Sequence, residues 1–447
     1  MLSMDWIRDN PELVRAAAER KGIEADVPAL LASDERRRAL LRRVEALRQA
    51  RNERSRLVGT RLREGRTAEA EAAKREVERV RDELGELEKA LADAERDWRE
   101  RLLRVPNVAS PDTPIGASDE DNAEVERRGD VPEFPFAPRD HVAIGELHGM
   151  IDLARGVKTA GSRWYYLRGA GALLHRAVQQ GALDVLLERG FTPMDVPLMA
   201  RAEAFTNTGF YPGGEAQTYR LDGDGLTLIG TSEVPLVNYY AGEIVDARRP
   251  IKLAAASYCF RSEAGSAGRD VRGLYRVHQF AKVEQVVLCE ADPALAEALL
   301  QEITDNAKRI LELLELPYRV VAVCTGDMSP KTYKQYDLET WMPSRGTYGE
   351  THSSSLLLDF QARRADIRYR DGRGNLRYCY TLNNTAIASP RILIPLLENH
   401  QREDGSVTIP KALRPYMYGL ERLTPDTSAP IAPRVPTGAP RVSPDES

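Results

Sequence analysis

The longest hydrophobic pattern in the chain lies between residues 70 and 98, where apolar residues recur in alternating steps of three and four. These residues are Ala70, Ala73, Val77, Val80, Leu84, Leu87, Leu91, Ala94 and Trp98. This spacing is typical of a helix whose apolar stripe packs against a second helix. The segment from residue 34 to residue 104 contains no proline, and we therefore expect it to be helical almost throughout.

The first half of this segment begins with the same spacing over residues 40–47, but Arg51 and Arg54 then occupy the positions of the stripe. Gly65 lies between the two halves and is expected to end the first helix, and Thr67 is expected to cap the second. The pattern predicts an antiparallel helical hairpin. At ~1.5 Å of rise per residue, each helix of the hairpin would be roughly 50 Å long.

Prolines and an acidic run after Arg104 predict the end of this N-terminal domain (residues 1–104) and a linker over residues 105–131. From residue 132 to residue 419, helical stretches alternate with short runs rich in β-branched and aromatic residues. The predicted helices include 171–189 and 294–315, and the predicted strands include 226–229, 258–261, 283–288, 318–323 and 367–369. This alternation predicts an α+β body. Residues 420–447 are rich in proline and predict a disordered tail.

Composition excludes several classes of protein. The 447 residues are 42% hydrophobic and 29% charged, which is ordinary for a globular protein, and no apolar run is long enough for a membrane span. The first residues do not resemble a secretory leader, and the four cysteines form no CxxC pair. We therefore expect a cytoplasmic protein without membrane association and with reduced thiols.

Charge is unevenly distributed along the predicted hairpin. The net charge of the whole chain is −5, which excludes a uniformly basic nucleic-acid coat. Residues 34–66, however, hold 12 basic and 5 acidic side chains, whereas residues 67–104 hold 9 basic and 12 acidic ones. A basic helix in an acidic protein suits a phosphate backbone. The candidate contacts are Arg51, Arg54, Arg56 and Arg61; the alternative is a hairpin that serves only as a dimerisation element or a spacer.

The candidate chemistry lies in two runs of the body. The first run brings Arg261 and Glu263 to the edge of a glycine-rich loop, and the second returns with Arg276, Phe280 and Glu284. If residues 276–284 form a strand, alternate side chains share one face and present cations, an aromatic ring and a carboxylate together. Such a face can clamp a phosphate, stack on a base and hold an ammonium group. The alternative is a salt-bridged hairpin at the edge of a sheet.

These two runs resemble motif 2 of the class II aminoacyl-tRNA synthetases, and in detail that of the seryl-tRNA synthetases. Other segments resemble the same family in the same order along the chain. They are the opening helix at 10–15, the tRNA-binding arm, its exit at 105–107, motif 1 at 190–197, the serine-binding TxE element at 231–233, and motif 3 at 382–399. The resemblance implies a catalytic domain built on an antiparallel sheet flanked by helices, and a homodimer joined near motif 1.

The resemblance also implies roles for individual residues. Catalytic roles fall to Arg261, Glu263 and Arg391. ATP would be bound by Arg261, Ser262, Glu263, Arg276, Val277, Phe280, Glu350, Thr351, His352, Ser353 and Arg391. Serine would be bound by Thr231, Ser232, Glu233, Arg261, Glu284, Asn383 and Thr385, and Mg²⁺ by Glu350 and Ser353. The hard oxygen atoms of the last two residues suit that ion.

Four positions depart from the pattern of the family. His352 replaces a small hydroxyl residue, Leu356 replaces an amide, Pro390 precedes Arg391 where glycine is common, and Thr385 stands in place of the frequent serine. None of these changes removes a charged ligand. The hypothesis is therefore an enzyme that activates L-serine with ATP to seryl-adenylate and transfers it to the 3′ end of tRNA(Ser). The alternative is a specialised paralogue that supplies seryl-tRNA or seryl-adenylate to a biosynthetic pathway, or that confers resistance to an inhibitor.

Overall fold

A computed structural model of the chain describes residues 1–265 and 272–425. The chain separates into two compact units, one from Met1 to Val108 and one from Ala109 onward. Most of the predicted tail, residues 426–447, lies outside the described residues. Its first residues are not disordered, which corrects that prediction: Leu423 is buried, and strand β17 (Arg422–Leu423) pairs with strand β16 (Val407–Thr408).

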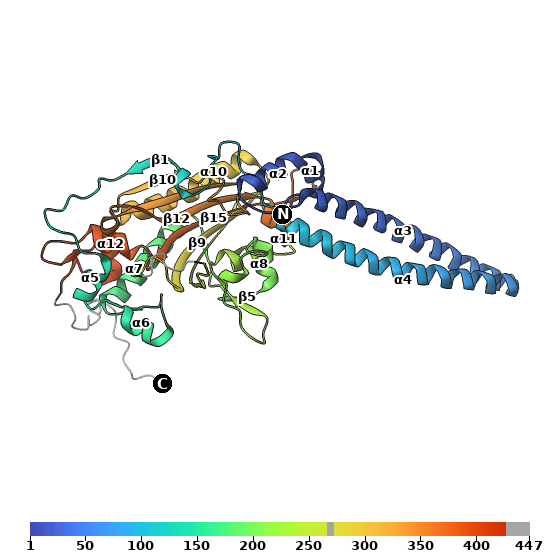
Figure 1. Ribbon diagram of the computed structural model, residues 1–447, viewed down its shortest axis with the longest axis horizontal. Coiled ribbons are helices and arrows are strands. Elements are labelled where there is room, and N and C mark those ends of the chain that lie inside the picture. Colours follow the sequence, from blue (N-terminus) through green and yellow to red (C-terminus); the bar gives the residue numbers. More distant parts are fainter. Residues whose placement is uncertain (266–271, 426–447) are drawn as a thin grey trace, which may run out of the picture. The chain divides into compact units, whose positions relative to one another are not determined.

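The N-terminal unit consists of four helices (Figure 1). They are α1 (Met4–Asp9), α2 (Pro11–Arg20), α3 (Val27–Arg63) and α4 (Thr67–Arg104). The first hairpin helix begins earlier than predicted because Pro28 is favourable in its first turn and the Asp26 carboxylate accepts a hydrogen bond from the Ala29 amide at 2.9 Å. Thr67 is not the cap that was predicted. It is the first helical residue of α4, and Arg66 holds the N-cap position without a side-chain hydrogen bond.

Helices α3 and α4 pack side by side along their length (Figure 1). Every residue of the predicted apolar stripe in α4 is buried or half-buried, and Val44 of α3 packs against Leu84 and Leu91. A second cluster at the base of the hairpin includes Ile7 and Leu30 from different helices. The predicted antiparallel hairpin is therefore present.

The second unit is built on an eight-stranded sheet with the order β1-β10-β11-β12-β15-β9-β8-β4. Neighbouring strands are antiparallel except β4 and β8. The bounds are β1 (Ala123–Arg128), β10 (Tyr318–Ala322), β11 (Lys334–Met342), β12 (Thr347–Leu358), β15 (Tyr380–Ser389), β9 (Gln279–Cys289), β8 (Ile251–Phe260) and β4 (Thr192–Pro193). The predicted strands at 258–261, 283–288 and 318–323 overlap β8, β9 and β10, and the first and last of them extend one residue too far.

Helices α7 (Ala170–Glu188) and α10 (Pro293–Leu313) pack against the sheet and share its main hydrophobic core. They correspond closely to the two long helices predicted for the body. The shorter helices are α5 (His141–Leu147), α6 (Leu153–Ala160), α8 (Ala202–Thr208), α9 (Glu233–Asn238), α11 (Phe360–Ala365) and α12 (Leu393–Asn399), with 3₁₀ turns η1 (Asp119–Asp121), η2 (Glu215–Gln217), η3 (Pro343–Arg345) and η4 (Lys411–Met417).

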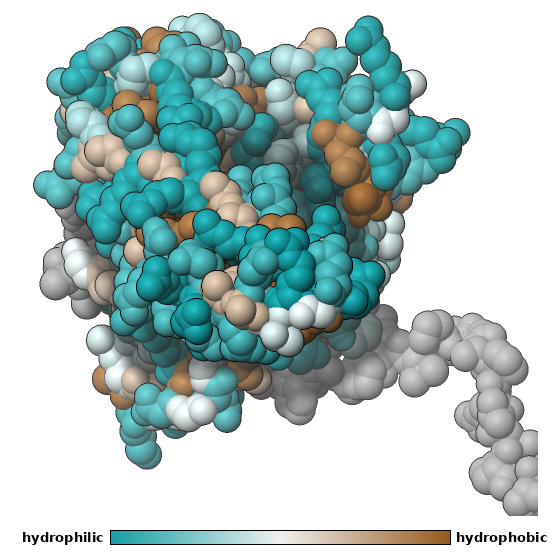
Figure 2. All heavy atoms as spheres, turned by 90° about the vertical axis from the view of Figure 1, so that its right-hand side faces the viewer, coloured by the Kyte–Doolittle hydropathy of each residue, from teal (hydrophilic) through white to brown (hydrophobic). Residues whose placement is uncertain are grey.

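Small sheets complete the second unit. Their strands are β2 (Ile151–Asp152) with β3 (Tyr166–Leu167), β5 (Met199–Arg201) with β6 (Leu226–Leu228), β7 (Ile244–Val245) with β13 (Arg368–Arg370) and β14 (Leu376–Tyr378), and β16 (Val407–Thr408) with β17 (Arg422–Leu423). The face of the molecule in Figure 2 is mostly hydrophilic, with small separate apolar patches. Among the described residues, no helix has both the length and the apolar character that a membrane crossing requires.

Candidate active site

One face of the large sheet collects the polar side chains of the predicted site. Glu284 of β9 lies opposite Thr385 of β15, and Asn383 lies opposite Ser355 of β12. Because directly paired residues point to the same side of a sheet, these side chains share a face. Alternation within β9 adds Phe280 to it. The opposite face carries the apolar core against α7 and α10.

A β-bulge in strand β12 decides which of its residues reach this polar face. Glu350 pairs with Glu339 and His352 pairs with Leu338, so Thr351 is the extra residue between them. Strict alternation would place Glu350 and Ser353 on opposite faces, but the bulge returns Ser353 to the face of Glu350. It also turns His352 to the other face, where the side chain is fully buried and contacts the Thr351 hydroxyl at 2.8 Å.

The end of strand β8 places Arg261 at the mouth of the site. Its backbone amide donates to the His278 carbonyl at 2.9 Å, and its guanidinium carbon lies 5.2 Å from the centroid of the Phe280 ring. Glu263 has a positive φ of 53° and accepts a hydrogen bond from Arg276 at 2.7 Å. Strand β9 begins at Gln279, so the prediction that residue 276 belongs to the strand is wrong. The loop nevertheless brings Arg276 to Glu263.

A cleft with about 540 Å³ of open space joins these elements. The predicted site residues that line it are Arg261, Glu263, Arg276, Val277, Phe280, Glu350, Thr351, Thr385 and Arg391. A neighbouring pocket adds Thr231 and shares Arg261, Glu263 and Arg276 with the first. The two pockets therefore meet at these three side chains and form one continuous region.

Arg391 holds the far side of the cleft together. Its Nε donates to the Tyr275 carbonyl and its Nη1 donates to the Glu350 carbonyl, both at 3.1 Å. The Glu350 carboxylate lies 3.6 Å from the same guanidinium. The guanidinium carbon also lies 4.4 Å from the centroid of the Tyr275 ring. Arg391 therefore holds Tyr275 at both its carbonyl and its ring. Pro390 does not prevent Arg391 from facing the cleft.

Two buried ion pairs lie deeper on the same face. Lys282 contacts Glu284 at 2.6 Å, and Lys331 contacts Glu233 at 2.5 Å, with all four side chains at most 8% exposed. Gln361 adds a hydrogen bond to Glu233 at 2.6 Å. Burial raises the pKa of the Glu284 carboxyl and lowers the pKa of the Lys331 ammonium, because each charged form loses its water. The four charges sum to zero, so an additional ammonium group is not repelled by a net positive pocket.

Glu350 and Ser353 share their face with a further carboxylate, that of Asp337 on β11. Burial and the neighbouring Glu350 raise the pKa of Asp337, and the Ser353 hydroxyl contacts its carboxylate. Within the described residues there is no cluster of three or more His, Cys, Asp or Glu side chains arranged around a metal. Two hard oxygen ligands fit a cation such as Mg²⁺, which keeps several waters and shares its remaining coordination with phosphates.

Some predicted site residues do not direct their side chains into the cleft. Ser262 bonds the Ala216 carbonyl, Ser232 is buried with its hydroxyl 3.5 Å from the Ala255 carbonyl, and His352 lies on the helix-covered face. Thr351 contributes its backbone, since its hydroxyl bonds the Thr340 hydroxyl at 2.6 Å beneath the cleft. Leu356 also belongs to the helix-covered core, so the His352 and Leu356 departures lie away from the polar face.

Sequence analysis missed Tyr275, Lys282, Lys331 and Asp337. Lys282 was placed on the predicted face, between Phe280 and Glu284, as one of its cations, but it was given no role in binding. Lys331 has no comparable signal because it lies in a loop that is 98 residues from its partner Glu233. Asp337 could be found only from the register of β11 against β12.

The four arginines predicted to bind phosphates all lie in the distal half of α3, and they differ in their contacts. Arg54 lies 3.8 Å from Glu76 and Arg61 lies 3.7 Å from Glu69, both on α4. Arg51 contacts the neighbouring Asn52, and Arg56 is exposed. These pairs are themselves half-exposed, and such pairs contribute little to stability and exchange partners easily.

Two family models match the chain. Residues 1–109 match the seryl-tRNA synthetase N-terminal domain, and residues 218–400 match the class II tRNA synthetase core domain of the G, H, P, S and T types. The chain is 48% identical over 424 residues to a serine–tRNA ligase of Deinococcus radiodurans, covering 95% of this chain and 99% of that protein. It is 43% identical over 431 residues to a serine–tRNA ligase of Rubrobacter xylanophilus, with the same coverage.

Solved structures give the same result. A seryl-tRNA synthetase of Pyrococcus horikoshii complexed with ATP is 36% identical with a TM-score of 0.86, covering 95% of this chain and 100% of that one. A cytoplasmic serine–tRNA ligase of Naegleria fowleri in complex with AMP is 27% identical with a TM-score of 0.80, covering 93% of this chain and 96% of that one. A prolyl-tRNA synthetase of Giardia lamblia, 17% identical with a TM-score of 0.55 over 61% of this chain and 54% of that one, shares the fold.

Proposed function

The chain belongs to the seryl-tRNA synthetase family and is an ATP-dependent serine–tRNA ligase, and we propose that the cleft between Arg261 and Arg391 is its site of serine activation. The observation that carries this proposal is the single polar sheet face on which two neighbouring strands, β9 and β15, place Phe280, Glu284 and Thr385 beside the two arginines. The comparisons contain nothing that favours a specialised paralogue.

The proposed ATP site occupies the outer part of the cleft. Phe280 offers a ring for the adenine, and Glu263 accepts hydrogen bonds from its edge. Arg276 and Arg391 flank the cleft and would neutralise the phosphates, because planar guanidinium groups bind phosphate oxygens in pairs. The hydrogen bond from Arg276 to Glu263 at 2.7 Å holds these two side chains next to each other in the absence of a ligand.

The proposed serine site lies in the inner part, at Thr231, Glu233, Glu284, Asn383 and Thr385. Two buried carboxylates attract the ammonium group of the substrate, and Lys282 and Lys331 balance their charge in its absence. The side-chain nitrogen of Asn383 is buried and makes no hydrogen bond within the described part of the chain. A substrate oxygen would satisfy this group, whose burial otherwise costs free energy.

Glu350 and Ser353 fit a magnesium ion, with hard oxygens on one face and Arg391 next to them. A bound magnesium ion supplies Lewis-acid neutralisation of the phosphate oxygens and helps to orient them. Asp337 lies beside both residues. Its contact with the Ser353 hydroxyl would hold that ligand in place.

Activation is an in-line displacement at the α-phosphorus of ATP. A carboxylate oxygen of serine forms the new bond to phosphorus, and the bond between the α-phosphorus and the bridging oxygen breaks to release pyrophosphate. No proton is transferred, so the residues act by positioning and by charge. Arg261 stands between the inner and outer parts of the cleft, where its guanidinium can stabilise the negative charge that develops on the α-phosphate.

The N-terminal hairpin is the proposed binding element for tRNA(Ser), through Arg51, Arg54, Arg56 and Arg61. The basic excess of α3 and the exposed, exchangeable ion pairs of these arginines support the proposal. We also propose a homodimer joined near residues 190–197, on the sequence resemblance alone, and a cytoplasmic location, on the composition of the chain and the spacing of its cysteines. A truncation of residues 51–79, closed by a short glycine-rich loop, keeps the cluster around Val44 and removes all four arginines.

The decisive experiment measures pyrophosphate exchange into ATP with serine, threonine or alanine and no tRNA. We expect exchange with serine and Mg²⁺. The truncated protein should retain this exchange and lose tRNA charging, because only the second step needs the hairpin. Exchange with another amino acid but not with serine would contradict the substrate assignment, and equal loss of both activities in the truncated protein would contradict the role of the hairpin.

A further inference from the structure

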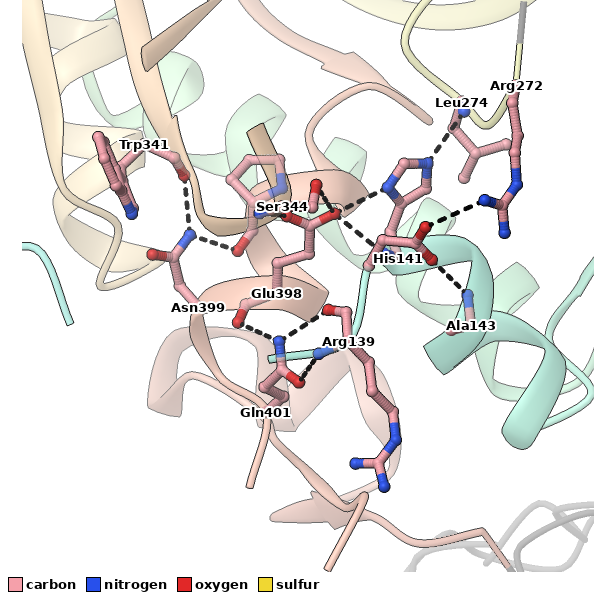
Figure 3. Close-up of polar contacts among 12 residues, drawn as sticks. Arg139, His141, Ala143, Arg272, Leu274, Trp341, Ser344, Glu398, Asn399 and Gln401 are labelled. Carbon is pink, nitrogen blue, oxygen red and sulfur yellow. Dashed lines mark hydrogen bonds and ion pairs between the residues drawn. The ribbon is translucent and has the colours of Figure 1, made fainter. Parts of the chain in front are cut away.

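A fully buried carboxylate outside the proposed cleft organises three segments of the chain. Glu398 of α12 accepts hydrogen bonds from the backbone amide of His141 at 2.9 Å and from its Nδ1 at 2.8 Å. It also accepts from the backbone amide of Ser344 at 2.9 Å and from its hydroxyl at 2.8 Å (Figure 3). A buried carboxylate is retained at a cost unless such donors satisfy it, and four contacts do so here.

These contacts fix the proton on the imidazole of His141. A carboxylate oxygen can only accept, so Nδ1 carries the hydrogen, and Nε2 is free to accept one. Nε2 accepts from the backbone amide of Leu274 at 3.2 Å (Figure 3). The imidazole therefore acts as a bridge between Glu398 and the backbone of the loop that enters β9.

The loop end held by this bridge lines the cleft. Leu274, Tyr275 and Arg276 are consecutive, and all three contribute to the cleft wall. Gly273, with a φ of 95°, packs so closely on the imidazole that a Cβ would lie 2.4 Å from Nε2 of His141. The imidazole thus limits the path of the backbone by its bulk, and its Nε2 also provides a hydrogen-bond acceptor for the Leu274 amide.

Ser344, which donates two hydrogen bonds to Glu398, connects this carboxylate to Tyr275 through the neighbouring residue. The next residue, Arg345, places its guanidinium carbon 4.3 Å from the centroid of the Tyr275 ring. The segment that leads to His141 is also fixed, because Gln401 donates to the Arg139 carbonyl at 2.9 Å and accepts from the Arg139 amide at 2.8 Å (Figure 3). Glu398 therefore influences the position of Tyr275 in two ways. One is through His141 and the backbone of the adjacent Leu274, and the other is through Ser344 and the adjacent Arg345.

We propose that His141, held by Glu398, is a positioning residue for ATP, which sets the backbone of Leu274–Arg276 so that Arg276 meets the phosphates. This inference rests on the proposed function, since it concerns the same cleft. The serine side of the cleft is formed by β9, β15 and α9, which His141 does not contact among the described hydrogen bonds. Loss of the bridge should therefore raise KM for ATP and leave KM for serine unchanged.

Two substitutions of His141 distinguish the contribution of Nδ1 from that of Nε2. The carboxamide of His141→Gln reaches the place of Nε2, and its oxygen can accept from Leu274. The shorter carboxamide of His141→Asn reaches only the place of Nδ1 and keeps the contact with Glu398. We expect His141→Asn to raise KM for ATP in serine-dependent exchange by about 3- to 10-fold, the effect of one lost hydrogen bond. His141→Gln should stay within about twofold of the wild type, and neither should change KM for serine.

His148 supplies the matched control. It is also buried and follows the same helix α5, but its Nε2 contacts the Gly405 carbonyl at 2.8 Å, away from the cleft. His148→Asn should lower the melting temperature without changing KM for ATP. Equal values of KM for ATP in His141→Asn and His141→Gln, or an equal rise in His148→Asn, would overturn the inference. Absence of serine-dependent exchange in the wild type would instead overturn the proposed function.

Discussion

The hairpin and the cleft both depend on ion pairs, but the surroundings of these pairs are opposite. Arg48 and Glu88 join α3 and α4 at 2.7 Å with side chains 52% and 43% exposed, whereas Lys282 and Glu284 lie 2.6 Å apart with side chains 7% and 2% exposed. Exposed pairs contribute about 0–1 kcal/mol and are screened by salt. Buried pairs are costly to form and keep one arrangement. Charges on the hairpin can therefore exchange partners, and charges in the cleft are fixed for one substrate.

The largest effect that tests this comparison is expected from Arg261→Ala. A fixed donor aimed at a developing charge contributes about 3–4 kcal/mol, so exchange should fall by roughly 10²- to 10³-fold. Arg248→Ala is the control, because this arginine is 82% exposed and pairs only with Asp246 among the described ion pairs. Serine-dependent pyrophosphate exchange measures both. A similar loss in the two variants would show that the position in the cleft is not what matters.

Neutralising Arg51, Arg54 and Arg56 together should weaken tRNA binding in a salt-dependent way. Each lost phosphate contact removes ~0.7–0.9 from the slope of log K against log salt, so the slope should flatten by about 2–3 units. Arg75, Arg79 and Arg81 of the acidic helix α4, all of them exposed, provide a matched triple neutralisation. Equal flattening by both sets would mean that the hairpin attracts tRNA without preference for α3.

The pH dependence of serine binding tests the buried pair. Burial raises the pKa of Glu284, so this carboxyl takes up its proton at a higher pH than an ordinary glutamate. The protonated form no longer attracts the ammonium of serine. KM for serine should therefore be constant above this pKa and rise by up to about tenfold per pH unit on acidification below it. Glu284→Gln should give a high KM that does not change with pH. A KM of the wild type that stays flat down to the ordinary pKa of a glutamate side chain would contradict the assignment.

The smallest effect is expected from Thr385→Ser. The Thr385 hydroxyl lies 3.5 Å from Nζ of Lys282, and the serine variant can keep this contact while losing one methyl group from the cleft wall. One methyl group corresponds to ~0.8 kcal/mol, so the ratio of threonine to serine activation should rise by no more than about fourfold. Exchange with each amino acid measures the ratio. An unchanged ratio would show that the methyl group does not face the substrate.

The sequence predicted the hairpin well because a helix pair depends on local periodicity. The apolar steps from Ala70 to Trp98 needed no knowledge of the rest of the chain, although the cap at Thr67 was wrong. Short strands were also found, with shifted ends. The order of strands in the sheet could not be predicted from the hydrophobic pattern, because β9 and β15 pair residues about a hundred positions apart, such as Glu284 and Thr385.

The candidate site was predictable only as far as local motifs extend. Arg261, Glu263 and Arg276 lie within one segment of the sequence and meet in the cleft. His352 was assigned to the ATP site because it adjoins Glu350 and Ser353, but the bulge at Thr351 turns it away. Contacts between distant segments, such as His141 with Glu398 across 257 residues, have no local signal at all.

The bulge at Thr351 also limits how the gene can change. Its hydroxyl bonds the Thr340 hydroxyl at 2.6 Å and the Leu338 carbonyl at 3.3 Å, so the extra residue is anchored to the adjacent strand. Codon substitutions here alter one side chain at a time. Loss of this one codon would remove the bulge and leave Glu350 and Ser353 two positions apart, still on one face, whereas one extra codon without a second bulge would put them on opposite faces. A descendant sequence that lacks this residue is therefore expected to keep both side chains on the polar face, whereas a sequence with one residue more at this point of β12 is expected to separate them.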